Sequence, residues 1–145
     1  YSLPRISETS EVLIGACFFA KIDLDRAYWQ VPLAEEDRQK TAFLVNNQLF
    51  EFNVMPFGSM NAPATFQRLM DRVLSGLSWR NCLVYMDDIL VFSKSFDQHL
   101  QDIDDVLKRI IQANLLVKPE KCFFACDEVN YLGYRITRNG IQATT

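Results

Sequence analysis

Two short apolar runs near the middle of the chain, 82–85 and 89–92, are separated by only Met86, Asp87 and Asp88. The length and composition of these runs are typical of strands, and so short a connection indicates a tight turn between them. The sequence therefore predicts a strand–turn–strand unit that carries two adjacent carboxylates at its turn. The apolar strands on both sides leave these two side chains little room to move apart.

Two segments beside this unit change to the period of a helix. In the first, apolar side chains recur at i, i+3, i+4 and i+7, with Asn61 placed to cap the helix and Pro63 tolerated in its first turn. The apolar face of this helix consists of Phe66, Leu69, Met70, Val73, Leu74 and Leu77. Ser95 and Gln98 form a capping box that begins the second helix, which ends near Asn114. Its predicted apolar face consists of Leu100, Ile103, Val106, Leu107, Ile110 and Ile111.

The remaining strands are predicted from alternation and from turn-forming residues. Segment 18–24 alternates as a strand does, and 129–136 predicts a final strand before a turn at 138–140. Segments 41–45 and 49–54 flank a turn-prone Asn-Asn-Gln stretch, which predicts a hairpin. Helices that are interleaved with antiparallel strands predict an α+β fold with helices packed on a sheet.

Size and composition describe one globular domain. The chain has 145 residues, of which 49% are apolar and 23% are charged, and this excludes a disordered or fibrous protein. Because no linker, repeat or low-complexity tract divides the sequence, we expect a single folding unit over 1–145. No apolar run approaches the ~18–20 residues of a membrane span. The net charge of −3 gives no indication of a nucleic-acid partner, since a domain that holds nucleic acid by charge alone is usually basic.

The cysteine and histidine residues argue against a soft metal site. Cys17, Cys82, Cys122 and Cys126 lack the paired spacing of a zinc site, and His99 is the only histidine. Cys17 and Cys82 lie in apolar runs, which predicts that both are buried as small hydrophobic residues. Nothing in this pattern demands an oxidising compartment, so we expect an intracellular protein.

Asp87 and Asp88 are the strongest candidates for chemistry. Repulsion between two carboxylates held close together raises their proton affinity unless a cation is present, which favours a site for a hard metal ion. The alternative is an ordinary turn, where Asp is common because its side chain accepts hydrogen bonds from nearby backbone N–H groups.

Asp23 adds a third carboxylate near the end of the strand at 18–24. If this strand lies beside the hairpin that carries Asp87 and Asp88, Asp23 faces the pair across the sheet. Three carboxylates can hold two Mg²⁺ ions ~3.5–4 Å apart, the arrangement that clamps the attacking and leaving oxygens in phosphoryl transfer. Asp25 follows shortly after, and a solvated loop position is the interpretation that we favour for it.

A series of short motifs runs through the chain. They are Lys21-Ile22-Asp23-Leu24, Tyr28-Trp29-Gln30-Val31-Pro32-Leu33, Thr41-Ala42-Phe43, Met55-Pro56-Phe57-Gly58, Asn61-Ala62-Pro63-Ala64-Thr65-Phe66-Gln67, Tyr85-Met86-Asp87-Asp88-Ile89-Leu90-Val91-Phe92-Ser93 and Tyr131-Leu132-Gly133-Tyr134. In this order they resemble the motifs of reverse transcriptases. They are most similar to the polymerases of Ty3/gypsy-type retrotransposons, with retroviruses and caulimoviruses as near relatives. The ordered set covers nearly the whole chain and is far more specific than any single motif.

The resemblance implies catalytic roles for individual residues. Asp23, Asp87 and Asp88 match the metal-binding triad, and the backbone carbonyl of Leu24 matches a ligand that helps to hold the second metal ion. Tyr28 matches the aromatic side chain that lies beneath the sugar of the incoming nucleotide and acts as a steric gate. A half-buried aromatic residue beside a strand is the alternative for Tyr28.

Further matches surround the expected substrates. Phe57 and Gly58 match residues that line the nucleotide pocket. Leu132-Gly133-Tyr134 matches the primer grip, although a core strand explains the first of these residues equally well. Lys121 lies where the family often has a lysine near the triphosphate, but a solvated surface lysine is the interpretation that we favour.

The resemblance also implies an RNA-directed DNA polymerase, a nucleotidyltransferase. Its palm is a ferredoxin-like antiparallel sheet with helices on one face, here joined by a partial fingers hairpin, and we expect fingers strands before Tyr1 and a thumb and an RNase H domain after Thr145. The expected partners are an RNA or DNA template with its primer and deoxynucleoside triphosphates. The expected cofactor is Mg²⁺, as two ions, with Mn²⁺ as a substitute. Such polymerases act in cytoplasmic virus-like particles or in the nucleus, without a membrane.

Two departures from the family pattern leave the carboxylates in place. Asp25-Arg26-Ala27 stands where relatives often have a small residue and a glycine, and Met86 stands where they more often have Leu or Ile. One alternative function is a retained fragment that has lost catalysis and acts as a binding or assembly module. Another is a metal-dependent nuclease or nucleotidyl cyclase on a similar palm, which suits the acids but not the Pro-Phe-Gly and Leu-Gly-Tyr segments.

Overall fold

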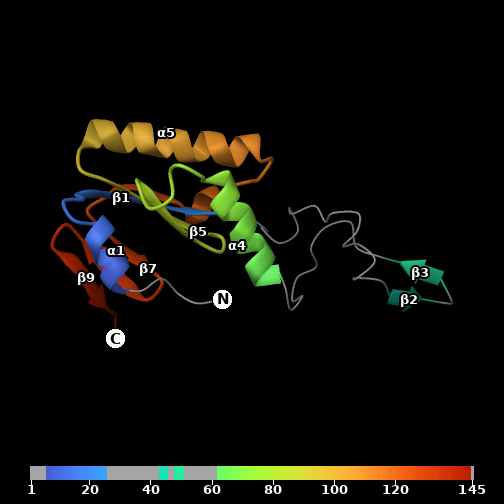
Figure 1. Ribbon diagram of the computed structural model, residues 1–145. Coiled ribbons are helices and arrows are strands. Elements are labelled where there is room, and N and C mark those ends of the chain that lie inside the picture. The colour runs from blue at the N-terminus through green and yellow to red at the C-terminus, as the bar shows by residue number, and fades with distance from the viewer. Residues whose placement is uncertain (1–5, 26–42, 46–47, 51–61, 145) are drawn as a thin grey trace.

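The computed structural model describes residues 6–25, 43–45, 48–50 and 62–144 of the chain. Figure 1 shows the arrangement of its helices and strands. In chain order the elements are α1 (Ile6–Val12), β1 (Phe18–Asp23), β2 (Phe43–Val45), β3 (Gln48–Phe50), α4 (Ala62–Val73), β4 (Cys82–Tyr85), β5 (Asp88–Ser93), α5 (Phe96–Gln112), the 3₁₀ turn η2 (Pro119–Lys121), β6 (Phe123–Cys126), β7 (Glu128–Tyr131), β8 (Tyr134–Thr137) and β9 (Gly140–Ala143).

A central antiparallel sheet has the strand order β4-β5-β1-β6. The predicted strand–turn–strand unit is confirmed as β4 and β5, which pair directly. Strand β1 lies on the other side of β5, in a register that runs from Phe18 opposite Ser93 to Asp23 opposite Asp88. The strand at 18–24 therefore lies beside the strand–turn–strand unit, which brings Asp23 to the same end of the sheet as Asp87 and Asp88.

The two faces of this sheet are covered by different elements. Alternate residues of β1, β4 and β5 face α4 and α5 and form one core with them, whose central members are Ala20, Ile22, Ile89, Val91, Phe66, Met70, Val106 and Ile110. The intervening residues form a second core with the β7-β8-β9 sheet, whose members include Phe19, Leu83, Leu90, Phe92, Val129, Tyr131 and Ile136. Figure 1 shows α5 along one side of the central sheet and β7 and β9 on the other. The predicted α+β fold with helices on one face is confirmed, whereas the sheet on the second face was not predicted.

Helix α4 begins at Ala62, so Pro63 lies in its first turn as predicted, while Asn61 is outside the described residues. The helix ends at Val73, earlier than its apolar period indicated. Leu74 and Leu77 are nevertheless buried, in the turn that follows. Gly76 has a φ of +86° in that turn, a left-handed conformation that glycine adopts easily and that ends a helix.

The Ser95 cap of α5 is confirmed, although the Gln98 side chain donates to Asp102 at 2.8 Å and does not complete the predicted capping box. The predicted buried face is confirmed only in part: Val106 and Ile110 are buried, and Ile103 and Leu107 pack against the core. The Ser95 side chain accepts a hydrogen bond from the Gln98 backbone N–H at 3.2 Å. Leu100 and Ile111, both assigned to the apolar face, are 52% and 67% exposed. The buried positions are His99, Asp102, Val106 and Ile110. The face is shifted because two polar side chains in the first half of the helix hydrogen-bond to Ser93 of β5 and are buried with it.

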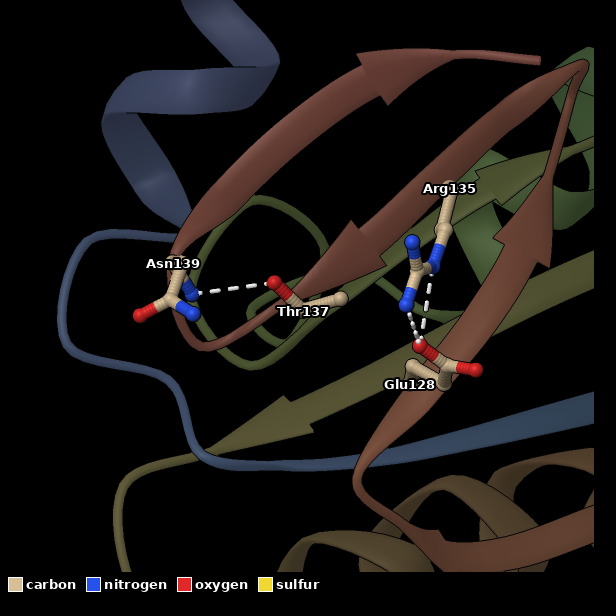
Figure 2. Close-up of polar contacts among 4 residues, drawn as sticks. All are labelled: Glu128, Arg135, Thr137 and Asn139. Atoms are coloured by element: carbon tan, nitrogen blue, oxygen red, sulfur yellow. Dashed lines mark hydrogen bonds and ion pairs between the residues drawn. The ribbon is translucent and has the colours of Figure 1, made fainter.

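The C-terminal segment corrects the prediction of a single strand at 129–136. The chain reverses at Leu132 and Gly133, whose φ values of +52° and +84° suit the tight turn of a two-residue hairpin between β7 and β8. The turn predicted at 138–140 is confirmed between β8 and β9. Figure 2 shows the Asn139 backbone N–H donating to Thr137 Oγ1 at 3.0 Å in that turn. It also shows an ion pair across the β7–β8 hairpin, between Arg135 and Glu128, with Nε to Oε2 at 2.9 Å.

Three smaller predictions can also be compared with the structure. Strands β2 and β3 pair as the predicted hairpin, in which Gln48 belongs to a strand rather than to the turn. Cys82 is buried as predicted, but Cys17 is only half-buried. Within the described ranges, no helix has the length and apolar character needed to cross a membrane.

Candidate active site

The sheet register brings two carboxylates together. Asp23 is the last residue of β1 and Asp88 is the first residue of β5, and they are direct partners across the antiparallel pair. Side chains of directly opposed residues project from the same face of a sheet. Asp87 lies in the preceding turn, where its backbone carbonyl accepts a hydrogen bond from the Leu24 N–H at 3.2 Å. All three predicted acids are therefore at one end of the central sheet.

A buried side chain of α4 holds the turn between β4 and β5. Met86 has a φ of +57°, which is uncommon for a residue other than glycine. Its N–H donates to Gln67 Oε1 at 2.8 Å, and Gln67 Nε2 donates to the Val84 carbonyl at 3.1 Å. Gln67 is only 3% exposed. Sequence reasoning missed this role, although a polar residue beside the buried positions of an amphipathic helix was a usable signal.

The other wall of the site is formed by η2 and the residues before it. The Lys118 N–H donates to the Asp23 carbonyl at 2.8 Å, which joins this segment to the end of β1. An open pocket of about 410 Å³ results, lined by Asp23, Leu24, Asp25, Asp87, Lys118, Glu120 and Lys121. Lys121 is exposed, as favoured from the sequence, but it also lines this pocket beside the acids. Asp25 lies past the end of β1 and is half-buried in the same pocket wall rather than fully solvated.

The electrostatics of the sheet end favour a bound cation. Burial raises the pKa of Asp23, and the nearby Asp87 carboxylate raises it further, while Lys121, Lys21 and Lys118 act in the opposite direction. The pKa of Asp88 is raised mainly by burial and also by Asp87 and Asp23, against the effect of Lys21. A raised carboxyl pKa means that the ionised form is disfavoured where it stands. A positive ion at this position would offset that cost.

The chemistry of the donor set fits a hard divalent cation, since carboxylate oxygens are the ligands that Mg²⁺ prefers. Asp23 and Asp87 line the pocket, whereas Asp88 lies outside its lining. Within the described part of the chain, no group of three or more His, Cys, Asp or Glu side chains converges closely enough to hold a metal ion. The assignment of Asp23, Asp87 and Asp88 as a metal triad, with Leu24 as a helper, therefore stays a prediction.

Tyr131 connects the site to the second sheet. Its hydroxyl donates to the Asp88 backbone carbonyl at 3.3 Å. Burial, and to a lesser degree the Asp88 charge, raise the pKa of Tyr131 well above its usual value, so the phenol stays protonated and able to donate. The next residues, Leu132 and Gly133, form the hairpin turn, and Tyr134 begins β8. Leu132 and Gly133 of the predicted primer-grip segment thus form a turn rather than a core strand, and this turn directly follows Tyr131, which hydrogen-bonds to Asp88.

Three predicted site residues, Tyr28, Phe57 and Gly58, lie outside the described residues. Their assigned roles stay predictions. Leu24 is described, and its side chain is buried in the core on the helix side of the sheet.

Comparison with known proteins decides the family. The family model described as "Reverse transcriptase (RNA-dependent DNA polymerase)" matches residues 1–136. The chain belongs to the reverse transcriptase family. The prediction made from the ordered motifs is therefore confirmed.

The curated relatives of this reverse transcriptase chain are retrotransposon polyproteins. It is 41% identical over 142 residues to the "Retrovirus-related Pol polyprotein from transposon 297" of Drosophila melanogaster, covering 98% of this chain and 13% of the relative. It is also 41% identical over 143 residues to the corresponding polyprotein from transposon gypsy of the same species, covering 99% and 14%. A Tf2-3 polyprotein of Schizosaccharomyces pombe is 36% identical over 140 residues, with 97% and 10% covered. These relatives confirm the predicted Ty3/gypsy type.

Solved structures give the same fold. The foamy viral protease-reverse transcriptase in complex with an RNA/DNA hybrid matches with a TM-score of 0.80 and 25% identity, covering 99% of this chain and 19% of that one. The same viral protein in complex with double-stranded DNA matches with a TM-score of 0.81 and 25% identity, covering 100% and 25%. The likeness agrees with a palm-like fold. The chain spans a quarter or less of the proteins named here.

Proposed function

We propose that this chain is the palm, with part of the fingers, of an RNA-directed DNA polymerase made within a retrotransposon Pol polyprotein. The observation that carries the proposal is the register that sets Asp23 opposite Asp88, with Asp87 beside them, in a chain of the reverse transcriptase family. An ordinary turn has no need of three acids at one sheet end, where burial, and then repulsion from the neighbouring carboxylates, raises the pKa of Asp23 and Asp88 and so disfavours their ionised forms.

The proposed reaction is the template-directed transfer of a deoxynucleotide to the 3′-hydroxyl of a primer, with release of pyrophosphate. Asp23, Asp87 and Asp88 are the residues proposed to hold two Mg²⁺ ions, or Mn²⁺ in their place, with the Leu24 carbonyl as a further ligand. When bound, such ions lower the pKa of the attacking hydroxyl and neutralise charge on the leaving group. The acids would fix the geometry of in-line attack.

Other residues of the chain are proposed to select and orient the substrates. Lys118 and Lys121 line the pocket with the acids and attract an anionic triphosphate. Tyr28 excludes a 2′-hydroxyl, and Phe57 and Gly58 line the nucleotide pocket. The turn between β7 and β8 supports the primer end. Each of these roles lowers the barrier by positioning rather than by bond-making.

The template and the remaining domains belong to the same proposal. The titles of the related foamy viral structures name an RNA/DNA hybrid and double-stranded DNA as bound partners, which supports a template–primer duplex as the partner here. The long polyprotein relatives support a parent protein that also supplies fingers strands, a thumb and an RNase H domain. We place the activity in cytoplasmic virus-like particles or in the nucleus.

The test is primer extension by the polymerase that contains this chain together with its flanking polyprotein segments. We expect Mg²⁺-dependent extension on an RNA template, and its loss in Asp88→Asn at unchanged fold. An inactive fragment that serves as a binding or assembly module would give no extension in the unmodified protein. Near wild-type extension by Asp88→Asn would show that the metal-ligand assignment is wrong.

A further inference from the structure

The pairing of β1 is interrupted on one side of Asp23, which leaves a gap between the Lys21–Phe123 pair and the Leu24–Val117 bridge. Strand β1 pairs with β6 only as far as Lys21, which lies opposite Phe123. The chain before Phe123 is the 3₁₀ turn η2 rather than a strand. In an antiparallel strand successive N–H groups point to opposite sides. Because the Leu24 N–H points to Asp87 of the β5 side, the Asp23 N–H points into the gap.

A thiol fills this gap. The Asp23 N–H donates to Cys122 Sγ at 3.4 Å, and Cys122 Sγ lies 3.3 Å from the Lys118 carbonyl, to which the S–H donates. The Asp23 carbonyl is farther from the sulfur, at 3.9 Å, and it accepts instead from the Lys118 N–H at 2.8 Å. The three residues therefore form a closed ring of hydrogen bonds. Two of the contacts, from the Asp23 N–H to Cys122 Sγ and from the Lys118 N–H to the Asp23 carbonyl, join β1 to the segment that carries Lys118 and Lys121. The third, from the Cys122 S–H to the Lys118 carbonyl, closes the turn within that segment.

Cysteine suits this place because its thiol is both a weak donor and a weak acceptor. Sulfur is also larger than oxygen, so it makes hydrogen bonds at distances that are too long for a hydroxyl. Cys122 is half-buried and packs against the helix-side core, so the contacts are partly shielded from water. The contacts thus join the two segments that carry Asp23 and the two lysines, Lys118 and Lys121, and all three residues line one pocket.

We propose that Cys122 is a positioning residue that holds the backbone of Asp23 against the lysine-bearing turn. The inference rests on the proposed polymerase function, because it assigns Cys122 an effect on how Asp23, Lys118 and Lys121 meet metal and triphosphate. Cys122 itself touches no reacting atom. A purely structural cysteine would affect stability alone.

The kinetic test uses the polymerase with its flanking segments and three variants, Cys122→Ala, Cys122→Ser and Cys126→Ala. Cys126 is the matched control, since it is also a half-buried thiol but its Sγ donates to the Phe124 carbonyl, away from the acids. Loss of a group that orients a metal ligand commonly costs at least ~10-fold in affinity. We therefore expect Cys122→Ala to raise the half-saturating Mg²⁺ concentration and the KM for the deoxynucleotide about 10-fold. The kcat at saturating Mg²⁺ should change much less.

Rescue and control variants separate positioning from packing. Cys122→Ser keeps a donor and an acceptor at a shorter reach, so its half-saturating Mg²⁺ concentration should lie between those of wild type and Cys122→Ala. Cys126→Ala should keep the wild-type value. Equal values for Cys122→Ala and Cys126→Ala, in an active enzyme, would overturn the inference.

A second measurement does not depend on activity. Amide hydrogen exchange of the 145-residue chain reports directly on the Asp23 N–H. We expect faster exchange at Asp23 in Cys122→Ala than in wild type, and no change in Cys126→Ala. Unchanged protection in Cys122→Ala would refute the contact. If the unmodified polymerase extends no primer, the polymerase proposal fails while the exchange result still decides whether Cys122 holds Asp23.

Discussion

Asp88 is half-buried, opposite Asp23 and next to Asp87, and both neighbours raise its pKa beyond the effect of burial. A carboxyl whose pKa is raised in the folded state stabilises folding below its unfolded pKa, and this stabilisation is lost as the pH rises through the folded pKa. At neutral pH and without metal, the ionised Asp88 therefore costs stability. We predict that Asp88→Asn has an equal or higher melting temperature at pH 7, and that the difference disappears in acid, where the wild-type carboxyl is protonated.

Asp104→Asn is a suitable control for this comparison. Asp104 forms an exposed ion pair with Lys108 at 2.8 Å, and such pairs contribute roughly 0–1 kcal/mol. Its loss should leave the melting temperature at pH 7 unchanged or slightly lower, the opposite sign. Thermal unfolding with EDTA present measures both variants. A clear drop in melting temperature for Asp88→Asn would contradict the electrostatic account of the site.

Gln67 supplies a second prediction at this scale. Its buried amide satisfies the Met86 N–H and the Val84 carbonyl, and Gln67→Ala leaves both groups without that partner. A buried backbone group left unsatisfied costs about 1–3 kcal/mol. We expect a loss of that order in the free energy of unfolding, measured in urea. Gln101→Ala, which removes an exposed amide that donates to Asp105 at 2.8 Å, should change it by less than ~0.5 kcal/mol.

Some of the residues at the candidate site could be predicted from the sequence, and others could not. The acids were found because two adjacent carboxylates stand at a tight turn between apolar runs, with a third at the end of another strand, and the register then placed Asp23 opposite Asp88 as expected. Gln67 and Cys122 were missed because each acts by hydrogen bonds to backbone groups far away in the sequence. Such contacts depend on which strand stops where, and a linear pattern does not contain that information.

At the scale of elements, α5 shows why periodicity placed a helix correctly but predicted its buried face only in part. Counting only apolar residues selected Leu100 and Ile111, which are exposed. Beside Val106 and Ile110, the face toward the sheet carries His99 and Asp102, which are completely or almost completely buried. Ser93 lies within hydrogen-bond distance of both, at 3.0 and 2.7 Å. In the sequence, polar residues on a helix predict a solvent-exposed face, and only the structure shows that these two are buried with a hydrogen-bond partner on another strand.

His99 connects three elements and gives the third prediction. Its Nε2 accepts from the Ala125 backbone N–H of β6 at 3.2 Å, so Nδ1 carries the proton and donates to Ser93. A second proton, on Nε2, would face the Ala125 N–H donor. Burial lowers the pKa of His99, against the effect of Asp102, the charged group that faces it.

A histidine whose pKa is lowered in the folded state stabilises folding above its unfolded pKa, near 6.5. This stabilisation is lost as the pH falls from 6.5 through the lower folded pKa. We predict that the free energy of unfolding decreases over this window in wild type and less steeply in His99→Gln, which keeps a donor and an acceptor without titrating. Urea unfolding at a series of pH values measures both slopes. Equal slopes would show that His99 protonation is not coupled to folding.

At the scale of the whole molecule, the strand order could not have been derived from local pattern. Strand β1 is inserted between β5 and β6, which follow it in the chain, and only the long-range register reveals this. The hairpin at Leu132 and Gly133 was missed for a local reason. Leu at a positive φ is not a turn signal in sequence, and the apolar residues around it read as one continuous strand.

The last prediction concerns the whole molecule: we expect the 145-residue chain by itself to fold but not to extend a primer. Both faces of the central sheet are covered by buried apolar cores, so cooperative thermal unfolding is expected.

Binding a template–primer duplex needs several Lys or Arg contacts to phosphates, whose contribution weakens with salt. The net charge of −3 opposes such binding, and the related polyproteins are far longer than the matched segment. We expect weak Mg²⁺ binding near Asp23, Asp87 and Asp88, no measurable duplex binding at moderate salt, and no primer extension with Mg²⁺ or Mn²⁺. Robust extension by this chain would show that the palm alone positions primer and triphosphate, with no need of the basic and duplex-holding segments assigned to the rest of the polyprotein.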